Sequence, residues 1–498
     1  MANPKRSLIL AGGGMRVAYQ AGVILAFSEE GLTFDHADGA SGGTMNLAMM
    51  LSGLSPREMQ HRWETLPVHD FASVMPLGKG TLQALGDARG VREGVFPRLG
   101  IDIDKIRSCS SLEGTFNVCN FTRKTSEVIP HRQMTMDHLV AGISLPLFMP
   151  PVSIDGSLYL DAVWIRDANL MEAVRRGAEE LWLVWCIGNT GQYHDGPFRQ
   201  YVHMIEISAN GSLFKEFDQI VEINARIAKG ETVYGHTEPI RLHVIRPEFP
   251  LPLDPDFFLG LIDAPTLIGY GYADAKKYLA ARTAEGVPFS PEVTKMADEI
   301  LGFTFREKMA GGFALGETDP ETGAKVGHDA GNTFTMHATI DIHDLNRFLS
   351  DASHPGSLTG RIDFAPLGFD VPSTSGVFNL FSPTNDPTMK YMVYELGFES
   401  NGRKYYMAGR KEVKQNPIVD LWKATTTLYT QLHEGIDKSG PVVGAGVLSL
   451  GVADLVAMVP TMHVTNASNP VEAAEAMSRF GHFFLGELWN TYVKKAGA

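Results

Sequence analysis

Two glycine-rich turns near the start of the chain are its most informative feature. The first, Gly12-Gly13-Gly14-Met15-Arg16, directly follows the apolar run Leu8-Ile9-Leu10-Ala11, and the second, Gly39-Ala40-Ser41-Gly42-Gly43, directly precedes a helical stretch at 45–51. A serine between small residues at a strand-to-helix turn exposes one hydroxyl at the end of a sheet. Glycines beside it let backbone N–H groups converge on a developing negative charge. The pair of turns indicates acyl transfer.

A serine hydroxyl such as that of Ser41 is a weak nucleophile until a base takes its proton. In the usual triad the base is a histidine oriented by a carboxylate, but a carboxylate within hydrogen-bond distance can also serve directly. The later histidines in the order of an α/β-hydrolase are His194, His203, His236 and His243, and each also fits a surface or core position. An α/β-hydrolase has several strands before its nucleophile, whereas Ser41 follows the second predicted strand.

The first half of the sequence alternates short apolar runs with helical periodicity, as βα units do. A helix is predicted from Val17 to Ser28, ended by Gly31. Strands are predicted at 7–11, 34–40, 115–121, 126–130 and 181–187, with further strands at 202–208 and 241–246. The continuous apolar run at 181–187 is typical of a strand buried on both faces of a parallel sheet. We expect a three-layer α/β/α domain with a mostly parallel sheet.

The pattern changes after about residue 300, where apolar and polar residues alternate as in half-solvated strands. Such stretches lie at 333–342, 358–364, 377–381, 389–399 and 403–413, and Asn401-Gly402 favours a type I′ hairpin turn. A final helix is predicted after Asn469, with Pro470 at its first position. Its apolar stripe comprises Ala473, Met477, Phe480, Phe484 and Leu488. We expect two domains, 1–295 and a mostly-β (α+β) accessory domain at 296–498, with the linker between 285 and 302.

Composition excludes several classes of protein. The 498 residues are 44% apolar and 20% charged, as in globular proteins. A net charge of -14 argues against a nucleic-acid partner and against electrostatic adhesion to anionic lipid. Cys109, Cys119 and Cys186 are too few and too scattered for a disulfide framework or a zinc cluster, so a reducing, cytoplasmic compartment is expected. The most membrane-like stretch, 442–459, is interrupted by Asp454, so membrane contact is expected to be peripheral, hydrophobic and local.

Other motifs have plainer interpretations. Gly12 to Gly14 lack the Gly-x-Gly-x-x-Gly spacing and no Lys-Ser/Thr follows, which argues against nucleotide binding. Asp102 and Asp104 lack further oxygen ligands at loop spacing, so a solvated turn is favoured over a cation site. Arg16 stands at a helix start, where pairing with a carboxylate is favoured over contact with a phosphate headgroup. An acyl pocket and an ordinary core both fit seven apolar residues: Met45, Met49, Met50, Leu145, Leu147, Phe148 and Met149.

A third segment adds to the two turns. Ala141 to Pro151 is followed by Ile154-Asp155-Gly156 and Leu160-Asp161, and the order of all these motifs resembles the patatin-like phospholipase family. The resemblance covers about the first 190 residues and implies a patatin-like domain extending to about residue 295. It implies a Ser–Asp dyad, with Ser41 as nucleophile and Asp161 as general base. It also implies an oxyanion hole from the backbone of Gly13, Gly14 and Gly42 and no metal or organic cofactor. Further members of the two motifs, with structural roles, are Gly12, Arg16, Gly39 and Gly43.

This chain departs from the family pattern at two positions. The family usually has two small residues after its aspartate, most often glycines, and this chain has Ala162-Val163. Asp155 is therefore the alternative base. Val17 stands where a glycine commonly follows the arginine, a change that leaves the preceding N–H donors in place.

The C-terminal half carries a second resemblance. Four stretches of sequence carry this resemblance: 303–309 together with Gly311-Gly312-Phe313, 376–381, Asp420-Leu421-Trp422 together with 425–429, and 480–489. These motifs resemble a region appended to some bacterial cholesterol-oxidase-like enzymes of the glucose–methanol–choline oxidoreductase group. No flavin is implied, because the chain has no dinucleotide fingerprint. Both resemblances share a hydrophobic, lipid-like substrate, so the accessory domain is expected to present or shelter lipid; a purely stabilising role is the alternative.

We therefore expect a lipid acyl hydrolase, a phospholipase A or other carboxylic ester hydrolase that works through an acyl-enzyme on a lipid or another hydrophobic ester. Two alternatives stay open. One is a non-catalytic lipid-binding protein with a decayed dyad, and the other is a small-ester hydrolase with a histidine-containing triad. The sequence leaves open the headgroup, the acyl position and the oligomeric state.

Overall fold

The computed structural model describes residues 4–67, 88–386, 389–414 and 425–496. The chain divides into two units, Met1–Asp298 and Glu299–Ala498, called the first and the second unit below. Buried apolar side chains form separate cores in the two units. No helix in the described part of the chain combines the length and the apolar character needed to cross a membrane.

The first unit is built on one mixed sheet with the order β5-β6-β3-β2-β1-β7-β8, with β4 paired to β3. Its strands are β1 (Arg6–Leu10), β2 (His36–Ala40), β3 (Glu113–Asn120), β4 (Thr125–Pro130), β5 (Val152–Ile154), β6 (Ser157–Asp161), β7 (Glu180–Val184) and β8 (Arg241–Ile245). The pairs that join β3, β2, β1, β7 and β8 are parallel, and β4, β5 and β6 pair antiparallel. The strands predicted at 7–11, 34–40, 115–121, 126–130, 181–187 and 241–246 are confirmed.

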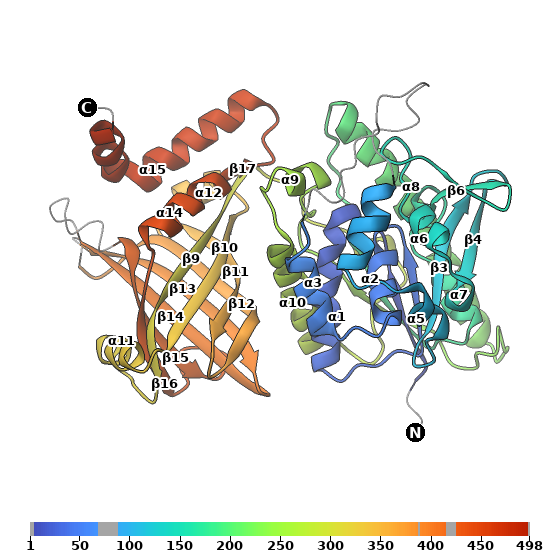
Figure 1. The fold of residues 1–498 in the computed structure, drawn as a ribbon, viewed down its shortest axis with the longest axis horizontal. Helices are drawn as coiled ribbons and strands as arrows, with labels where there is room; N and C mark the ends of the chain where they lie inside the picture. The colour runs from blue at the N-terminus through green and yellow to red at the C-terminus, as the bar shows by residue number, and fades with distance from the viewer. Residues whose placement is uncertain (1–3, 68–87, 387–388, 415–424, 497–498) are drawn as a thin grey trace. The chain divides into compact units, whose positions relative to one another are not determined.

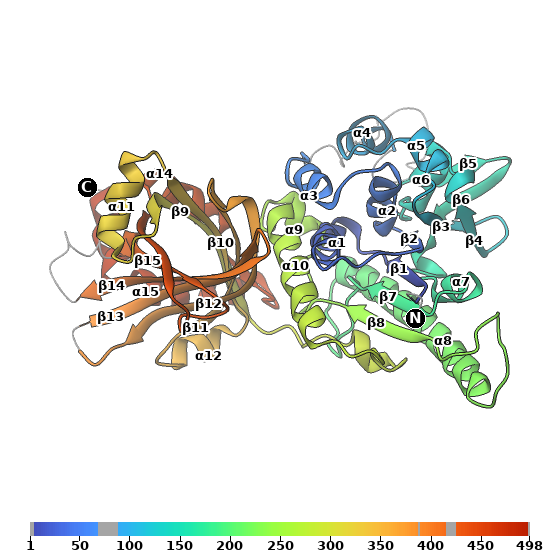
Figure 2. The same cartoon turned by 90° about the horizontal axis from the view of Figure 1, so that it is seen from below.

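Helices cover both faces of this sheet (Figures 1 and 2). Along β1, Leu8 and Leu10 belong to the core shared with α1, α2 and α10, whereas Ile9 and Ala11 belong to the core shared with α7 and α8. Alternate residues of a strand point to opposite faces, so both faces of β1 are buried under helices. The expected three-layer α/β/α domain is confirmed.

The helices of the first unit are η1 (Gly14–Val17), α1 (Ala18–Glu29), α2 (Gly43–Leu51), α3 (Pro56–Glu64), η3 (Val91–Val95), α4 (Phe96–Arg98), α5 (Ile103–Ser108), η4 (His131–Gln133), α6 (Met136–Gly142), η5 (Ala162–Trp164), α7 (Leu170–Arg175), α8 (Pro197–Ile227), α9 (Asp254–Phe258), α10 (Ala264–Ala281) and η6 (Pro291–Thr294).

The strand predicted at 202–208 is wrong, because these residues lie inside the long helix α8. Val202, Ala209 and Leu213 are buried, at the spacing of three to four residues that one face of a helix requires. Pro197 at the first turn fits the start of a helix, where the missing N–H costs nothing. The β-branched residues suggested a strand, but the helical periodicity extends over a longer stretch.

The second unit is a closed antiparallel sheet with helices. Its strand order is β10-β11-β12-β13-β14-β15-β16-β9, and β9 also pairs with β10, so the sheet closes on itself; β17 adds to β9. Its strands are β9 (Gly302–Leu315), β10 (Thr333–Ile342), β11 (Pro355–Phe364), β12 (Gly368–Pro383), β13 (Met389–Ser400), β14 (Arg403–Lys414), β15 (Thr427–Glu434), β16 (Val442–Ser449) and β17 (His463–Thr465). Its helices are α11 (Pro320–Asp329), α12 (Leu345–Ser350), α14 (Val452–Met458), η7 (Val459–Thr461) and α15 (Pro470–Ala496). The expected mostly-β C-terminal domain is confirmed.

Several local predictions in the second unit are also confirmed. Asn401 and Gly402 both have positive φ, 51° and 73°, as a type I′ turn between β13 and β14 requires. Asn469 caps α15 by accepting hydrogen bonds from the N–H groups of Val471 and Glu472. From that helix, Phe480 is fully buried, whereas Met477 is 37% exposed. The motif at 420–422 and the side chains of Phe484 and Leu488 lie outside the described residues.

A group of three polar side chains is buried within the sheet of the second unit. Glu307 shares a face of β9 with the core residues Phe305 and Met309. Its carboxylate accepts hydrogen bonds from Lys411 Nζ at 2.9 Å and from the Tyr394 hydroxyl at 2.9 Å. The Glu307 and Lys411 side chains are only 3% and 1% exposed, so this is a buried ion pair with a third hydrogen-bond partner.

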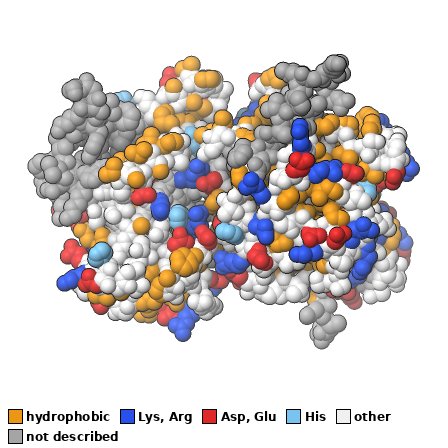
Figure 3. Space-filling model, in the orientation of Figure 1, with side chains coloured by type: hydrophobic (Ala, Val, Ile, Leu, Met, Phe, Trp, Pro, Cys, Tyr) orange, Lys and Arg blue, Asp and Glu red, His pale blue; other side chains and the backbone are white. Residues whose placement is uncertain are grey.

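Charged side chains are distributed over the surface. On the face of the molecule that Figure 3 shows, acidic and basic side chains are interspersed with apolar ones. A mixed surface of this kind is typical of globular proteins.

Candidate active site

The two glycine turns lie at the carboxyl ends of neighbouring parallel strands, β1 and β2. Ser41 follows β2 directly and has φ of +48°, a conformation that is uncommon for any residue but glycine. The turn is tight because the backbone of α2 approaches that of β1. A Cβ on Gly43 would lie 2.1 Å from the carbonyl oxygen of Leu10, and a Cβ on Gly42 would lie 2.6 Å from that of Gly14. Glycine is therefore required at both positions.

Strand register brings Asp161 to the same end of the sheet. In the β2–β3 pair Ala40 is aligned with Asn117, and in the β3–β6 pair Asp161 is aligned with Val118. Ser41 directly follows β2, and Asp161 is the last residue of β6. These two strands flank β3, so both residues lie at the same end of the sheet. Residues far apart in sequence meet because β6 runs antiparallel to β3.

The two side chains are hydrogen-bonded. Ser41 Oγ donates to Asp161 Oδ2 at 2.7 Å, and the other carboxylate oxygen accepts the N–H of Val163 at 2.9 Å. Ser41 and Asp161 are buried, 8% and 1% exposed. Burial raises the pKa of Asp161 to about 7, against the lowering effect of its two hydrogen bonds. A carboxyl group with this pKa can accept a proton near neutral pH.

The other candidate bases lie elsewhere or have other partners. Asp155 is exposed, in the turn between β5 and β6. His203 pairs with Glu206 at 2.9 Å, His236 bonds the carbonyl of Val174, and His243 bonds the Tyr278 hydroxyl. The hydroxyl of Ser41 thus has a carboxylate as its partner.

Two carboxyl groups that the sequence did not single out contact the first glycine turn, the buried Asp167 and the half-buried Asp254. Gly12 donates its N–H to Asp167 Oδ2 at 2.9 Å, and Met15 donates its N–H to Asp254 Oδ1 at 2.9 Å. Burial raises the pKa of both groups, that of Asp167 to about 8. Neither residue lies in a motif, so no local signal in the sequence marks them.

A cavity of about 360 Å³ opens beside Ser41. Its lining includes Ser41, Asp161 and the backbone of the predicted oxyanion donors Gly13, Gly14 and Gly42. The apolar wall comprises Met15, Met45, Val91, Ile143, Leu145, Phe148, Met149, Val163, Ile187, Phe198, Val202, Ile205, Leu253, Pro255 and Phe258. Of the residues predicted as pocket or core, Met49 is in the core, Met50 packs partly buried against it, and Leu147 is exposed.

The remaining sequence motifs have structural roles. Arg16 is buried and its Nε donates to the carbonyl of Gly13 at 2.9 Å, which ties the glycine turn to its own helix. Gly39 packs against Leu47 of α2. Asp102 caps α5 by accepting the N–H groups of Asp104 and Lys105, which explains this pair without a cation.

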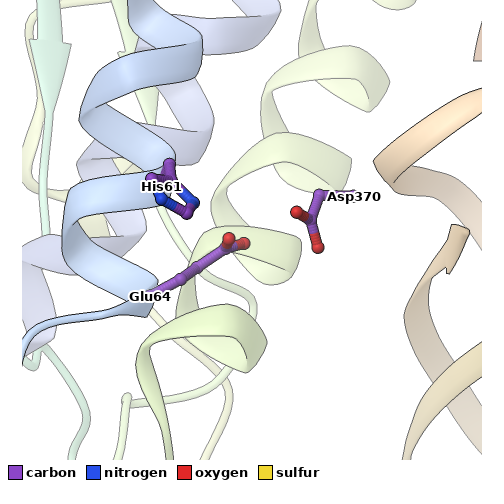
Figure 4. A group of neighbouring side chains, drawn as sticks. All are labelled: His61, Glu64 and Asp370. Atoms are coloured by element: carbon purple, nitrogen blue, oxygen red, sulfur yellow. The ribbon is translucent and has the colours of Figure 1, made fainter.

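Potential metal ligands are drawn in Figure 4. His61 and Glu64 lie one turn apart on α3 of the first unit, and Asp370 belongs to β12 of the second unit. The positions of the two units relative to one another are not determined, so no metal site is assigned to these side chains.

Comparison with known proteins identifies the first unit. Residues 8–174 match the family model described as patatin-like phospholipase. No curated protein matches the chain. Among solved structures, VipD from Legionella pneumophila has 12% sequence identity and a TM-score of 0.33, over 56% of this chain and 67% of VipD. The complex of SpcU with ExoU from the type III secretion system of Pseudomonas aeruginosa has 12% identity and a TM-score of 0.20, over 57% of this chain and 72% of the matched chain. The family match spans both glycine turns and Asp161, and the chain therefore carries a patatin-like phospholipase domain at residues 8–174.

Proposed function

We propose that the first unit hydrolyses acyl esters of lipids with Ser41 as nucleophile and Asp161 as general base. The observation that carries this proposal is the 2.7 Å hydrogen bond from Ser41 Oγ to Asp161 Oδ2 beside the apolar cavity. The cavity wall suits an acyl chain, because burial of an apolar chain in an apolar cavity is favourable.

The reaction has two steps. Asp161 takes the proton of Ser41 as Oγ attacks the ester carbonyl carbon, and the N–H groups of Gly13, Gly14 and Gly42 stabilise the oxyanion. The carbon–oxygen bond of the ester breaks, and the leaving alcohol receives the proton from Asp161. A water molecule, deprotonated by Asp161, then attacks the acyl-enzyme, and Ser41 recovers its proton when the fatty acid leaves.

A fluorophosphonate probe tests the nucleophile. We expect the probe to label Ser41 in the wild type, and we expect Ser41→Ala to lose both labelling and esterase activity. A protein that binds lipid and remains unlabelled would favour the non-catalytic alternative. A histidine triad would be favoured if replacing His194, His203, His236 or His243 alone by Ala abolished turnover in a folded protein.

We also propose peripheral contact between the cavity entrance and an aggregated lipid surface. The segments that line the cavity carry four exposed apolar side chains, Leu147 (55% exposed), Phe198 (37%), Phe258 (46%) and Leu259 (73%). Exposed apolar groups beside a lipid cavity favour a lipid interface over water.

Interfacial kinetics test this contact. Leu259→Asp and Leu147→Asp should lower activity on lipid vesicles or micelles and leave hydrolysis of a monomeric short-chain ester unchanged. The matched control is Ile207→Asp, since Ile207 is 72% exposed but lies on the opposite face of α8 from the cavity-lining Val202 and Ile205. Equal losses in the control and the test variants would contradict the proposal.

For the second unit we propose an accessory, lipid-handling role. Support comes from its separate core and from its resemblance to the region appended to cholesterol-oxidase-like enzymes. A chain that ends at Asp298 should lose activity on long-chain esters selectively and retain it on short-chain esters. Equal losses on both substrates would leave the second unit with a stabilising role.

A further inference from the structure

The turn at residues 12–16 divides its backbone N–H groups between two carboxyl groups, one buried and one half-buried, and the cavity. Asp167 accepts the N–H of Gly12, and Asp254 accepts that of Met15, each at 2.9 Å. Within the described residues, the N–H groups of Gly13 and Gly14, between these two, have no hydrogen-bond partner, and both glycines line the cavity.

Both carboxyl groups pack directly against the glycines. A Cβ on Gly12 would lie 2.3 Å from Asp167 Oδ1 and 2.6 Å from the Cβ of Ser41. A Cβ on Gly14, whose φ is +58°, would lie 2.4 Å from Asp254 Oδ2. The turn is therefore held between the nucleophile and two acidic side chains, with no room for a larger residue at either glycine.

Burial of Asp167 in this position is energetically unfavourable. It is fully buried, and within the described residues its Oδ1 has no hydrogen-bond partner. Burying a polar oxygen without a partner is unfavourable. The charged groups that act on it are Asp161, from the end of β6, which raises its pKa, and Arg16, from η1, which lowers it. A buried carboxyl group of this kind is more typical of a functional site than of a stabilising interaction.

We propose that Asp167 is a positioning residue for the oxyanion donors. It fixes the N–H of Gly12 while Asp254 fixes that of Met15, so the N–H groups of Gly13 and Gly14 are left to face the ester oxygen. This inference rests on the proposed function, since it assigns a support to the same oxyanion hole. Preorganised donors are effective because they need no reorientation during the reaction.

The protonation of Asp167 follows from the same arrangement. Burial and the neighbouring Asp161 raise the pKa of Asp167 to about 8. Below that pH the group is neutral and places no negative charge next to the developing oxyanion. Above it, the ionised carboxylate opposes the oxyanion, so kcat should decline.

Three variants test the proposal with a soluble short-chain ester. Asp167→Ala should lower kcat about 10²- to 10³-fold, the effect typical of a lost oxyanion donor, with KM changed less than about threefold. Asp167→Asn keeps an acceptor oxygen for Gly12, so it should recover kcat to within about tenfold of the wild type. The matched control is Asp274→Asn. Asp274 is a half-buried carboxyl group whose pKa is raised by burial to about 7, but its partner is Tyr19, so kcat should not change.

The pH profile separates positioning from a general effect on folding. The wild type should lose kcat above about pH 8, and Asp167→Asn should lack this decline. An unchanged kcat in Asp167→Ala would overturn the proposal. If Asp167→Ala does not fold, a decline above pH 8 that persists in Asp167→Asn would overturn it instead. Failure of the proposed function is distinguishable, because the wild type would then show no fluorophosphonate labelling of Ser41.

Discussion

Two groups of buried ionisable side chains, one in each unit, are held in opposite ways. In the first unit, Asp161 and Asp167 are held by N–H and O–H donors, and burial raises the pKa of each. In the second unit, the carboxylate of Glu307 meets the ammonium group of Lys411 at 2.9 Å. The first arrangement keeps a carboxyl group that can accept a proton, Asp161, beside a cavity, and the second neutralises charge inside a closed sheet.

The difference separates a reactive site from a structural one. A buried carboxylate without a cation is destabilised in its charged form, so it takes up a proton readily and can act as a base. A buried ion pair is inert by comparison, but removal of one partner leaves an uncompensated charge. Under the proposed function, the same residue types serve chemistry in one unit and the integrity of the core in the other.

Removal of the proposed base should have the largest effect. Asp161→Asn should lower kcat by about 10²- to 10⁴-fold, the range typical of general-base catalysis. The variant should not unfold more readily at pH 8, since it replaces a buried ionised carboxylate by a neutral amide. Steady-state kinetics and thermal unfolding measure both effects. Retained activity would exclude Asp161 as the base.

Breaking the buried ion pair should affect stability instead of catalysis. Lys411→Met leaves Glu307 charged and unpaired, which costs about 3–5 kcal/mol in the free energy of unfolding of the second unit. The double variant Lys411→Met with Glu307→Gln removes the lone charge and should recover most of this loss. Denaturant unfolding measures the free energies. A double variant as unstable as the single one would contradict the interpretation.

Rising pH should destabilise the first unit selectively. Asp161 and Asp167 have folded-state pKa values of about 7 and about 8, above the unfolded value. Stability from such raised carboxyl groups is full below the unfolded pKa and is lost as pH rises through the folded pKa. Buried His36 and His243 have lowered pKa values and act in the opposite direction, chiefly below about pH 6.5.

The informative window is therefore about pH 6.5 to 8. In calorimetry, the transition of the first unit should move to lower temperature across this window. The second unit should change little, since Asp363, paired with His337, has a lowered pKa and loses its contribution only in acid. Replacing both Asp161 and Asp167 by Asn should reduce the shift of the first unit but not abolish it, because the pKa values of Asp38 and Asp274 are also raised, to about 8 and about 7. An equal shift in both units would contradict the comparison.

Substitution of two glycines, one in each unit, should give the smallest difference between the units. Gly14 and Gly402 both have positive φ, but a Cβ on Gly14 would meet Asp254, whereas a Cβ on Gly402 has nothing within 4 Å. Gly402→Ala should cost only about 1 kcal/mol of stability, the strain of a left-handed alanine, and leave activity unchanged. Gly14→Ala should lose activity. Similar activities in the two variants would show that the glycine turn tolerates displacement.

The turn that carries Ser41 and the layers of the first unit could be predicted because local signals mark them. The strand and turn around Ser41 are encoded by a few adjacent residues, and the hairpins of the second unit by turn residues such as Asn401 and Gly402. Asp167 and Asp254 could not be predicted, since they reach the glycine turn across 155 and 239 residues of sequence. Helix α8 was mistaken in part for a strand because its β-branched residues outweighed their helical spacing in a short window.

The closure of the sheet in the second unit could not be predicted from local sequence signals either. Hairpin signals predict antiparallel neighbours, but the β9–β16 pairing joins residues near 312 to residues near 446. Such a pairing depends on the curvature of the whole sheet, which no short segment specifies.

That closure has a consequence for the protein at high concentration. In the described ring from β9 to β16, each strand has a partner on either side, so its backbone hydrogen bonds are made within the ring. An open sheet, by contrast, has edge strands with unpaired backbone groups. Another chain can add a strand to such an edge, and a fibril can begin there. Folded copies of the second unit should therefore resist strand exchange, and ordered aggregation should begin only after the ring has opened.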